Sequence, residues 1–384
     1  MSGSKTRGNS PMEILKFLQI VQLKCSKPAG KAAGFTLIEL LVGIILAFLV
    51  IAPLLGFVVN MMNTDRREQA KATSEQELQA AADYIARDLQ QAVYIYDATG
   101  VDPRGGNNIK SQLPSIPNTD SYPVLVFWKR KFLEQAISAD GQSACGTNST
   151  NCNDAFVYAL VAYYLTVPKN KANLAPWSGA AQIRRLEIQD GVKREAPGTR
   201  RQTYILENHP KIGRDKGFNF NLSKLTGPNL TAKMSSWTPG RLDPRNNATD
   251  KVVPETITKT PEVLVDYIDT SKANTPNLPQ EDCPIDATNP DNTDPTWQRV
   301  PRYTSDPPSR GTRQANTPPP ALETYSFFAC VYSSKNTAQV FLRGNALARI
   351  QPNNQDPPTY DRRNSAFFPT ARIEATGSGG LRIQ

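Results

Sequence analysis

The feature that most constrains this chain is an apolar stretch from Phe35 to Val59, which contains a single charged residue, Glu39. A helix of about 25 residues is long enough to cross a lipid bilayer with some tilt. A carboxylate inside such a span costs several kcal/mol unless it is paired or neutralised. The sequence therefore predicts a membrane anchor whose one carboxylate has a function.

The segment before the anchor, residues 1–34, is basic. It contains six lysines and arginines and one glutamate, and thus accounts for five of the nine excess positive charges of the chain. The remainder of the chain is close to charge balance and has no cluster of basic and aromatic residues, so we expect no nucleic-acid partner. By the positive-inside rule, the basic segment is expected on the cytoplasmic side.

The junction Gly34–Phe35 places a small residue before a bulky apolar one, directly upstream of the apolar stretch. An ordinary signal peptide is cleaved after a shorter apolar core. A cut at Gly34–Phe35 would instead leave the anchor on the mature protein.

The run Gly34-Phe35-Thr36-Leu37-Ile38-Glu39-Leu40 resembles the class III signal of type IV prepilins and pseudopilins. The resemblance implies that a prepilin peptidase and N-methyltransferase cuts after Gly34 and methylates the new N-terminal Phe35. It also implies that Glu39 is an assembly residue, and that the partners are other pilins or pseudopilins and an inner-membrane assembly platform. The expected location is the inner membrane, with a periplasmic head that enters a periplasmic or extracellular fibre.

Two further stretches, Tyr84–Ala92 and Val340–Leu347, resemble the larger minor pseudopilins of type II secretion. The long leader, the size of the head and its Asn-, Pro- and Thr-rich insertions look closest to the hormogonium polysaccharide secretion pseudopilins of filamentous cyanobacteria. That family implies a structural subunit of a fibre that exports polysaccharide for gliding motility. The alternatives are a minor pilin of a type II secretion or type IV pilus system whose head binds DNA, a surface or a glycan, and a membrane-anchored exported enzyme.

The expected fold class is α+β, with a long N-terminal helix packed on an antiparallel sheet. After the anchor at 35–59, an amphipathic outer helix is predicted over 60–96, because apolar residues recur there at three- and four-residue steps. Pro53 and Gly56 interrupt the anchor, and Ser74 with Glu77 matches a capping box, which predicts that the helix pauses and restarts there. Residues 97–384 are expected to form an extracytoplasmic head.

Seven segments of the head are rich in β-branched and aromatic residues and bounded by turn formers, which predicts strands. They are Tyr122–Leu133, Asp154–Val167, Ile183–Ile188, Glu262–Asp269, Tyr325–Ser333, Gln339–Leu342 and Ala371–Ala375. The polar segments 191–260 and 270–321 have little periodicity and are predicted to be irregular surface insertions.

Five cysteines occur, and Cys25 would leave with the leader. The four that remain, Cys145, Cys152, Cys283 and Cys330, suggest two disulfides in an exported domain. Four cysteines allow three pairings. Proximity in sequence favours Cys145–Cys152 and Cys283–Cys330.

The sequence contains no recognisable catalytic motif, so we expect that the protein is not an enzyme and has no cofactor. No hydrolase, metalloprotease, P-loop or dinucleotide-binding motif is present, and the one histidine, His209, is interpreted as a solvated loop residue. Glu187 and Asp190 flank a predicted strand end and are interpreted as part of a solvated strand face.

Two ligand sites are weaker candidates. Asp286, Asp291 and Asp294 lie on a loop and offer oxygen ligands for calcium, although their spacing matches no EF-hand. The aromatic segments around Trp128, Tyr163–Tyr164 and Phe367–Phe368 could stack on sugars, but strand alternation favours their burial in the core.

The class III interpretation is tested by Gly34→Val. A side chain larger than glycine is expected to clash in the peptidase, so the variant should remain about 34 residues longer than the mature wild type. Intact-mass measurement of the membrane-extracted protein checks this. Mature-length protein from the variant would contradict the class III signal.

Overall fold

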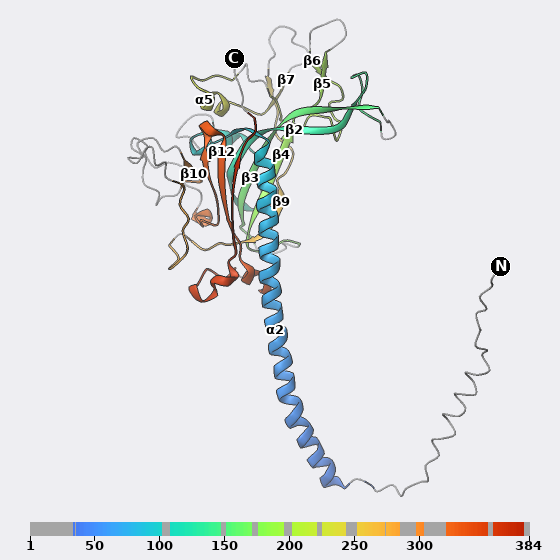
Figure 1. Ribbon diagram of the computed structural model, residues 1–384, viewed down its shortest axis with the longest axis vertical. Helices are drawn as coiled ribbons and strands as arrows, with labels where there is room; N and C mark the ends of the chain where they lie inside the picture. Colours follow the sequence, from blue (N-terminus) through green and yellow to red (C-terminus); the bar gives the residue numbers. More distant parts are fainter. Residues whose placement is uncertain are drawn as a thin grey trace, which may run out of the picture. The chain divides into compact units, whose positions relative to one another are not determined.

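The computed structural model describes residue 34 and residues 36–101, 108–146, 151–170, 176–195, 202–220, 225–242, 252–272, 274–284, 297–302, 320–351 and 356–379. The chain divides into two units, residues 1–63 and 64–384, and each is described by itself. The described residues combine one long helix with antiparallel sheets, which confirms the expected α+β class (Figure 1).

The long helix, α2 (Leu37–Gln90), is 54 residues long and runs through Pro53 without a break in the helix assignment. It also runs through Ser74, so the predicted restart at that position is wrong. The Ser74 hydroxyl does not cap the helix but accepts a hydrogen bond from Nε of Arg349 at 2.6 Å.

The predicted outer helix over 60–96 is also too long. The helix ends at Gln90, and strand β1 (Ala92–Ile95) follows with all four of its residues buried. The segment Ala-Val-Tyr-Ile favours a strand because its β-branched and aromatic side chains pack well against a neighbouring strand. That neighbour is β2, with which β1 pairs antiparallel.

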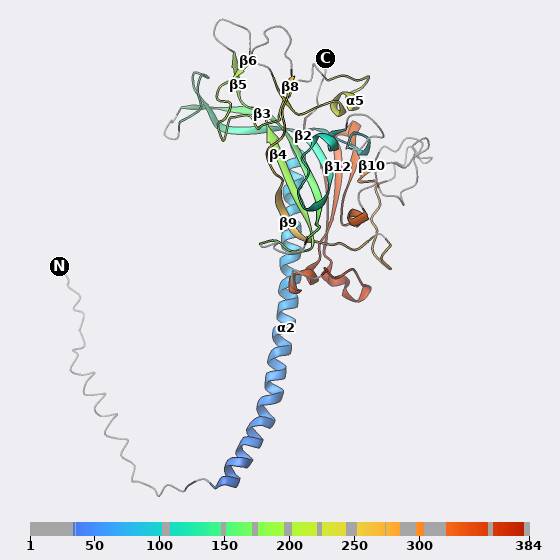
Figure 2. The same cartoon turned by 180° about the vertical axis from the view of Figure 1, so that it is seen from behind.

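The larger sheet has five strands in the order β1-β2-β3-β4-β9, and each neighbouring pair is antiparallel (Figure 2). The smaller sheet has four antiparallel strands in the order β10-β11-β12-β13. All seven predicted strands are confirmed by the structure, five with longer and two with shorter bounds. They are β2 (Thr119–Ser138), β3 (Cys152–Pro168), β4 (Ala181–Gln189), β9 (Glu262–Ile268), β11 (Phe327–Tyr332), β12 (Thr337–Arg343) and β13 (Thr370–Thr376). The eighth strand of the two sheets, β10 (Gln298–Val300), was not predicted.

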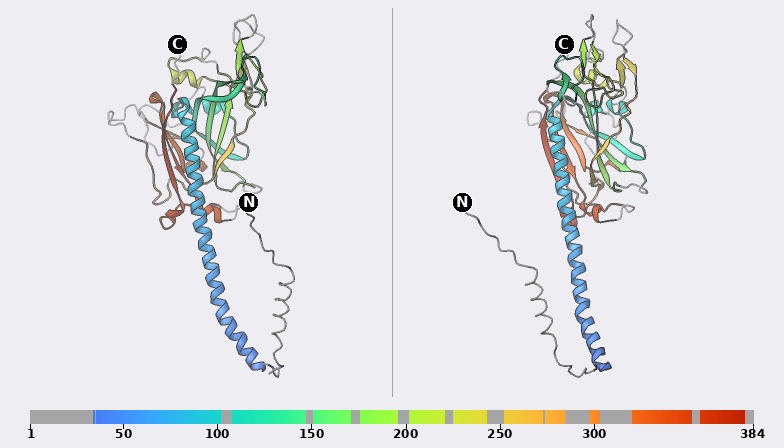
Figure 3. Two further views of the ribbon diagram at one scale, coloured as in Figure 1. Left: turned by 45° about the vertical axis from the view of Figure 1, so that its right-hand side comes forward. Right: turned by 90° about the vertical axis from the view of Figure 1, so that its right-hand side faces the viewer.

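Within the second unit, the part of α2 that begins at Thr64 lies against both sheets (Figure 3). Its buried positions follow one stripe of the helix, as the three- and four-residue spacing predicts. The stripe consists of Ala70, Ser74, Leu78, Ala81, Ala82, Ile85, Asp88 and Leu89.

The two sheets are joined by a buried ion pair, in which Nε of Arg343 lies 2.8 Å from Oδ2 of Asp269. Both side chains are almost completely buried, and the remaining donors of Arg343 bind the carbonyls of Pro279 and Thr324. A bridge between Ile268 and Gly344 lies beside this pair. The contact therefore connects the end of β9 to the end of β12.

The prediction that 191–260 is an irregular surface insertion is wrong for its described part. Trp237, Phe218 and Met234 from this segment are buried, and Trp237 and Phe218 pack on the ring of Trp128. Isolated aromatic residues in a polar segment can fill a core without leaving a periodic pattern. The segment contains β5 (Lys193–Glu195), β6 (Gln202–Tyr204), α5 (Leu230–Ser235), β7 (Gly240–Leu242) and β8 (Val252–Pro254).

The second predicted insertion, 270–321, lies largely outside the described residues and contributes β10 to the smaller sheet. The connections of the head include several short helices. They are α3 (Ala98–Val101), α4 (Ile109–Gln112), η2 (Pro320–Leu322), η3 (Ser333–Lys335), η4 (Ala346–Ile350) and η5 (Arg362–Phe367).

Two disulfides join Cys145 to Cys152 and Cys283 to Cys330, the pairing that sequence proximity favours. The first bridge closes the tip of the β2–β3 hairpin. The second attaches the segment before β10 to β11. The partners are separated by 7 and 47 residues, respectively.

The two bridges are expected to stabilise the head unequally. In the chain-entropy model, replacing Cys283 and Cys330 by serine costs about 4 kcal/mol, whereas replacing Cys145 and Cys152 costs about 2.5 kcal/mol, because the longer loop loses more entropy on closure. Denaturant unfolding of the detergent-solubilised variants checks the order. Equal losses from the two double variants would contradict it.

Candidate functional site

The apolar part of α2 exposes its side chains. From Leu37 to Met62 the large apolar side chains of the helix are exposed, Leu37 by 86% and Phe48 by 73%. This is one helix long and apolar enough to cross a membrane. Such a continuous apolar surface is not stable in water and requires a cover of lipid or of other apolar helices.

Glu39 lies in the first turn of this apolar segment. Its backbone N–H donates to Oγ1 of Thr36 at 3.3 Å, and a carboxylate in the first turn is favoured by the helix dipole. Among the described residues of the chain, the Glu39 side chain has no hydrogen-bond or ion-pair partner. Its charge is therefore available to a group outside the described part of the chain.

The predicted cleavage junction is only partly described. No atom lies within 4 Å of the position that a Cβ at Gly34 would occupy, so the chain itself leaves space for a larger side chain there. Phe35 lies outside the described residues. A requirement for glycine at position 34 would thus arise in the enzyme that cuts the chain.

The other end of α2 is fixed to the larger sheet by a buried ionic cluster, which we call the Asp88 cluster. Oδ1 of Asp88 lies 2.7 Å from Nζ of Lys129, and Oδ2 accepts hydrogen bonds from the Tyr163 hydroxyl at 2.6 Å and from Arg185 at 2.8 Å. The Asp88 and Lys129 side chains are each 6% exposed. The cluster consists of Asp88, Lys129, Lys131, Tyr163, Arg185 and Glu187.

Glu187 is the second carboxylate of the cluster. It forms ion pairs with Lys129 at 3.0 Å, with Lys131 at 2.6 Å and with Arg185. Its side chain is only 11% exposed, so the interpretation of Glu187 as part of a solvated strand face is wrong. The strand turns this side chain towards the helix, where the three cations neutralise it.

The environment of the cluster shifts two pKa values in directions that preserve it. Burial alone would raise the pKa of Glu187, but Lys129, Arg185 and Lys131 outweigh burial and hold the pKa far below its ordinary value. Burial and the neighbouring carboxylate of Asp88 raise the pKa of Tyr163 well above its ordinary value. Tyr163 therefore remains a hydrogen-bond donor and Glu187 remains an anion.

A second attachment holds α2 several turns earlier. Arg349 donates to Ser74, forms an ion pair with Glu77, and places its guanidinium 4.3 Å from the centre of the Tyr267 ring. From Ser74 to Asp88 the helix rises about 21 Å. Two polar attachments and the apolar stripe between them therefore fix the helix in both position and rotation.

The remaining sites predicted from the sequence are not brought together. Trp128, Tyr163, Tyr164 and Phe368 are buried, as strand alternation favours, and do not form a sugar-stacking surface. Asp190 is also buried, where it pairs with Lys193, so its assignment to a solvated face is wrong as well.

His209 lies in a loop, but its ring is not simply solvated. Nδ1 accepts hydrogen bonds from the backbone N–H groups of Lys211 and Ile212 and thereby closes a turn. The calcium candidates Asp286, Asp291 and Asp294 lie outside the described residues. Within the part of the chain that is described, no group of three or more His, Cys, Asp or Glu side chains could hold a metal ion.

The sequence interpretation did not identify the Asp88 cluster, although the sequence contains a signal for it. Asp88 falls between Ile85 and Leu89 on the buried stripe of the helix, and Lys129 follows the fully buried Trp128 in the predicted strand Tyr122–Leu133. A charged residue at an inward position requires a partner of opposite charge. The sequence gives no indication of which strand supplies that partner.

Comparisons with protein-family models, with curated proteins and with solved structures found no match to this chain.

The stability of the head is expected to depend on pH through Glu187. Because the folded-state pKa lies below the unfolded value of about 4.5, the stabilisation is present above that pH and is lost as pH falls. Glu187→Gln should cost about 3 kcal/mol at pH 7, because it leaves the buried Lys129 and the partly buried Arg185 and Lys131 with one carboxylate, and it should reduce the loss of stability between pH 5 and pH 3.

Denaturant unfolding at several pH values measures both effects. Glu374→Gln is the matched control, because Glu374 is an exposed carboxylate of β13. Equal acid dependence in wild type and Glu187→Gln would show that Glu187 is not stabilised by the three cations.

Proposed function

We propose that this protein is a minor pseudopilin, a structural subunit of a type IV pilus-like fibre that packs through its N-terminal helix. The observation that carries the proposal is the helix itself. It is continuous over 54 residues, its apolar part is exposed, and its first turn bears a single carboxylate without a partner in the described chain. An anchor with no role beyond membrane attachment would not need that carboxylate.

The proposed role of Glu39 follows from electrostatics. Cleavage after Gly34 creates a positively charged α-amine on Phe35, the one new cation at that depth. An ionised carboxylate in an apolar environment is too costly to persist without such a partner. We infer that the amine of an incoming subunit pairs with Glu39 of a subunit already in the fibre. Any other axial register leaves both charges unpaired, so the pair sets the stagger between subunits.

Fixation of α2 to the head supports the same role. The Asp88 cluster and the Arg349 contacts prevent the helix from sliding or rotating on the head. Within the unit 64–384, the part of α2 that begins at Thr64 is therefore a fixed part of the head.

The proposed setting is the inner membrane, with the leader cytoplasmic and the head periplasmic. The proposed partners are a prepilin peptidase and N-methyltransferase, other pseudopilins and an inner-membrane assembly platform. The resemblance of the leader and of the head insertions to hormogonium polysaccharide secretion pseudopilins supports polysaccharide export linked to gliding motility as the process served.

The assembly role is tested by Glu39→Ala and Glu39→Gln. Both variants should insert into the membrane and fold normally, because Glu39 belongs to the unit 1–63 and not to the unit that contains the head. Co-purification of partner pseudopilins should fall at least about tenfold in both, since charge rather than shape is required. Glu75→Gln is the matched control, an exposed carboxylate on the outer part of α2. Wild-type co-purification by both Glu39 variants would contradict the proposal.

A further inference from the structure

The β2–β3 hairpin extends beyond the rest of its sheet. β1 pairs with β2 only as far as Lys129, and β4 pairs with β3 only from Ala159 onward, so the two strands continue alone beyond these points (Figure 1). We call residues 130–138 and 152–158 the arm.

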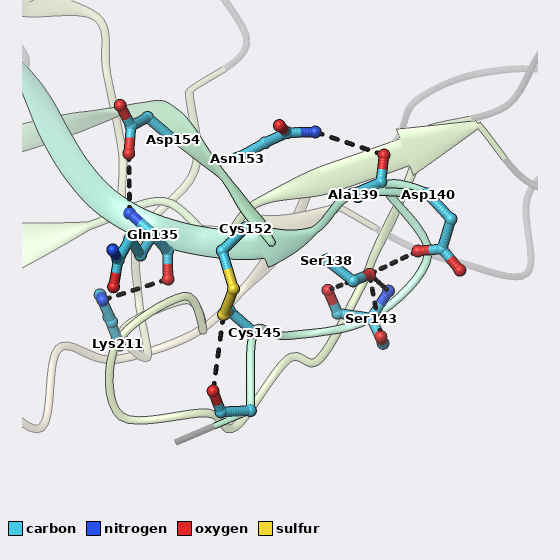
Figure 4. Close-up of a disulfide and its surroundings, with 11 residues drawn as sticks. Gln135, Ser138, Ala139, Asp140, Ser143, Cys145, Cys152, Asn153, Asp154 and Lys211 are labelled. Carbon is cyan, nitrogen blue, oxygen red and sulfur yellow. Dashed lines mark hydrogen bonds between the residues drawn. A yellow bond between two sulfur atoms is a disulfide. The ribbon is translucent and has the colours of Figure 1, made fainter. Parts of the chain in front are cut away.

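The arm is held in place at its tip and on one face. At the tip, the Cys145–Cys152 disulfide closes the loop, and the Gln135 N–H donates to Oδ1 of Asp154 at 2.8 Å (Figure 4). One face of the arm is covered by a small apolar cluster. Its buried members are Leu133, Ala136, Val157, Val192 and Ile212.

The uncovered face carries two exposed rings at its centre. Phe132 and Phe156 are direct partners across the two strands, their ring centres are 5.1 Å apart, and they are 49% and 52% exposed. Among the ring pairs of the described residues, this is the one in which both rings are exposed. The rings alone do not identify what covers them, but the charges around them do.

Charges of opposite sign lie on either side of the ring pair. Side chains alternate between the faces of a strand, so Arg130, Phe132 and Glu134 share one face of β2. Asp154 shares the same face of the arm with Phe156 on β3, and all five side chains are exposed. Arg130 lies towards the sheet and both carboxylates lie towards the tip, so the order along the face is cation, ring pair, anions. We call these five residues the arm surface.

The charges of the arm surface have no opposite charge beside them in the chain. The guanidinium carbon of Arg130 lies 3.9 Å from the centre of the Phe156 ring, and among the described residues no carboxylate forms an ion pair with it. In the same part of the chain no cation pairs with Glu134 or Asp154. Each charge is therefore available to a partner outside the chain.

Two lysines of this region already have partners of their own. Lys131 forms an ion pair with Glu187 at 2.6 Å, and Nζ of Lys211 donates to the carbonyl of Gln135 at 3.3 Å. Neither forms an ion pair with the carboxylates at the tip. The arm surface thus keeps its separation into a cationic and an anionic end.

We propose that the arm surface binds the arm surface of a second copy of this chain. A copy turned by 180° about an axis through the ring pair places its two carboxylates opposite Arg130 of the first copy, and its own Arg130 opposite the first copy's carboxylates. The four rings then meet at the centre. Such a contact is isologous, because one surface supplies both sides of every interaction.

The position of Arg130 over Phe156 is compatible with this contact. A cation over a ring is attracted by the electrons of the ring face, and this attraction uses none of the five N–H donors of a guanidinium. Phe156 remains half exposed beside Arg130, so the ring is still open to the second copy. Because the ring already holds the guanidinium in place, pairing with a carboxylate requires little further ordering of the side chain.

The mixed charge favours a second copy over other partners. An acidic ligand would be repelled by Glu134 and Asp154, and a basic ligand would be repelled by Arg130. A second copy in the opposite direction meets neither repulsion. One face of a two-stranded arm is smaller than the about 800 Å² per partner of a stable interface, so the contact is weak and depends on concentration. The inference is carried by the arm and does not depend on the proposed fibre.

The test uses the full chain at one copy per lipid nanodisc, so that the apolar helices of two copies cannot meet. Sedimentation velocity over a series of concentrations then measures association between heads, and the wild type should dimerise as concentration rises. Arg130→Glu and Glu134→Arg should each weaken self-association at least about tenfold, because each places like charges opposite one another. An equal mixture of the two variants should associate like the wild type, because their surfaces are again complementary.

Arg362→Glu is the matched control, because Arg362 is an exposed arginine outside the arm. This variant should associate like the wild type. The double substitution Phe132→Ala with Phe156→Ala should abolish association, and unchanged thermal unfolding of every variant excludes misfolding.

A wild type that stays monomeric overturns the proposal and leaves the arm surface to a partner of another kind. The proposal is also overturned if either charge variant associates like the wild type, if the mixture does not restore association, or if Arg362→Glu weakens association equally. Glu39→Ala should retain association, so a failure of fibre assembly and a failure of this contact produce different results.

Discussion

The contact between the buried carboxylate of Asp88 and the larger sheet is the constraint on which the placement of the helix depends. Desolvating a carboxylate costs several kcal/mol, and that cost is offset only where Lys129, Arg185 and Tyr163 all reach it. A shift of α2 by one turn would move Asp88 by about 5.4 Å and break all three contacts. The apolar stripe makes the helix adhere to the head, and the charged cluster selects one register for it.

A second carboxylate, Glu39, lies near the other end of the helix and differs from Asp88 in its partners. Asp88 has three partners within the chain, whereas Glu39 has none among the described residues. An ionised carboxylate in apolar surroundings is stable only beside a cation. For Asp88 the cations come from the folded chain, and we infer that Glu39 receives its cation from another subunit during assembly. Under the proposed function, the part of α2 that begins at Thr64 belongs to the head, and the apolar part contacts other subunits.

Much of the fold could be predicted from the sequence because it depends on local patterns. The apolar run, the seven strand segments and the cysteine spacing each carry a signal within a few residues. The Asp88 cluster could not be predicted, because its members come from α2, β2, β3 and β4, and no local pattern reports which strands meet. Glu187 illustrates the problem, since a carboxylate near a strand end usually faces solvent. Trp237 and Phe218 were missed for a related reason, because single aromatic residues in a polar segment have no periodicity.

The central claim is that the apolar helix contacts other subunits through a register set by Glu39. The most direct measurement places a photo-crosslinking amino acid at Leu40, an exposed position one residue from Glu39. Illumination of cells that express the full chain should then trap the N-terminal segments of other proteins that carry a prepilin signal. The same experiment in a Glu39→Gln background should lose those products. Crosslinks to lipid alone, or protein crosslinks that do not depend on Glu39, would contradict the account.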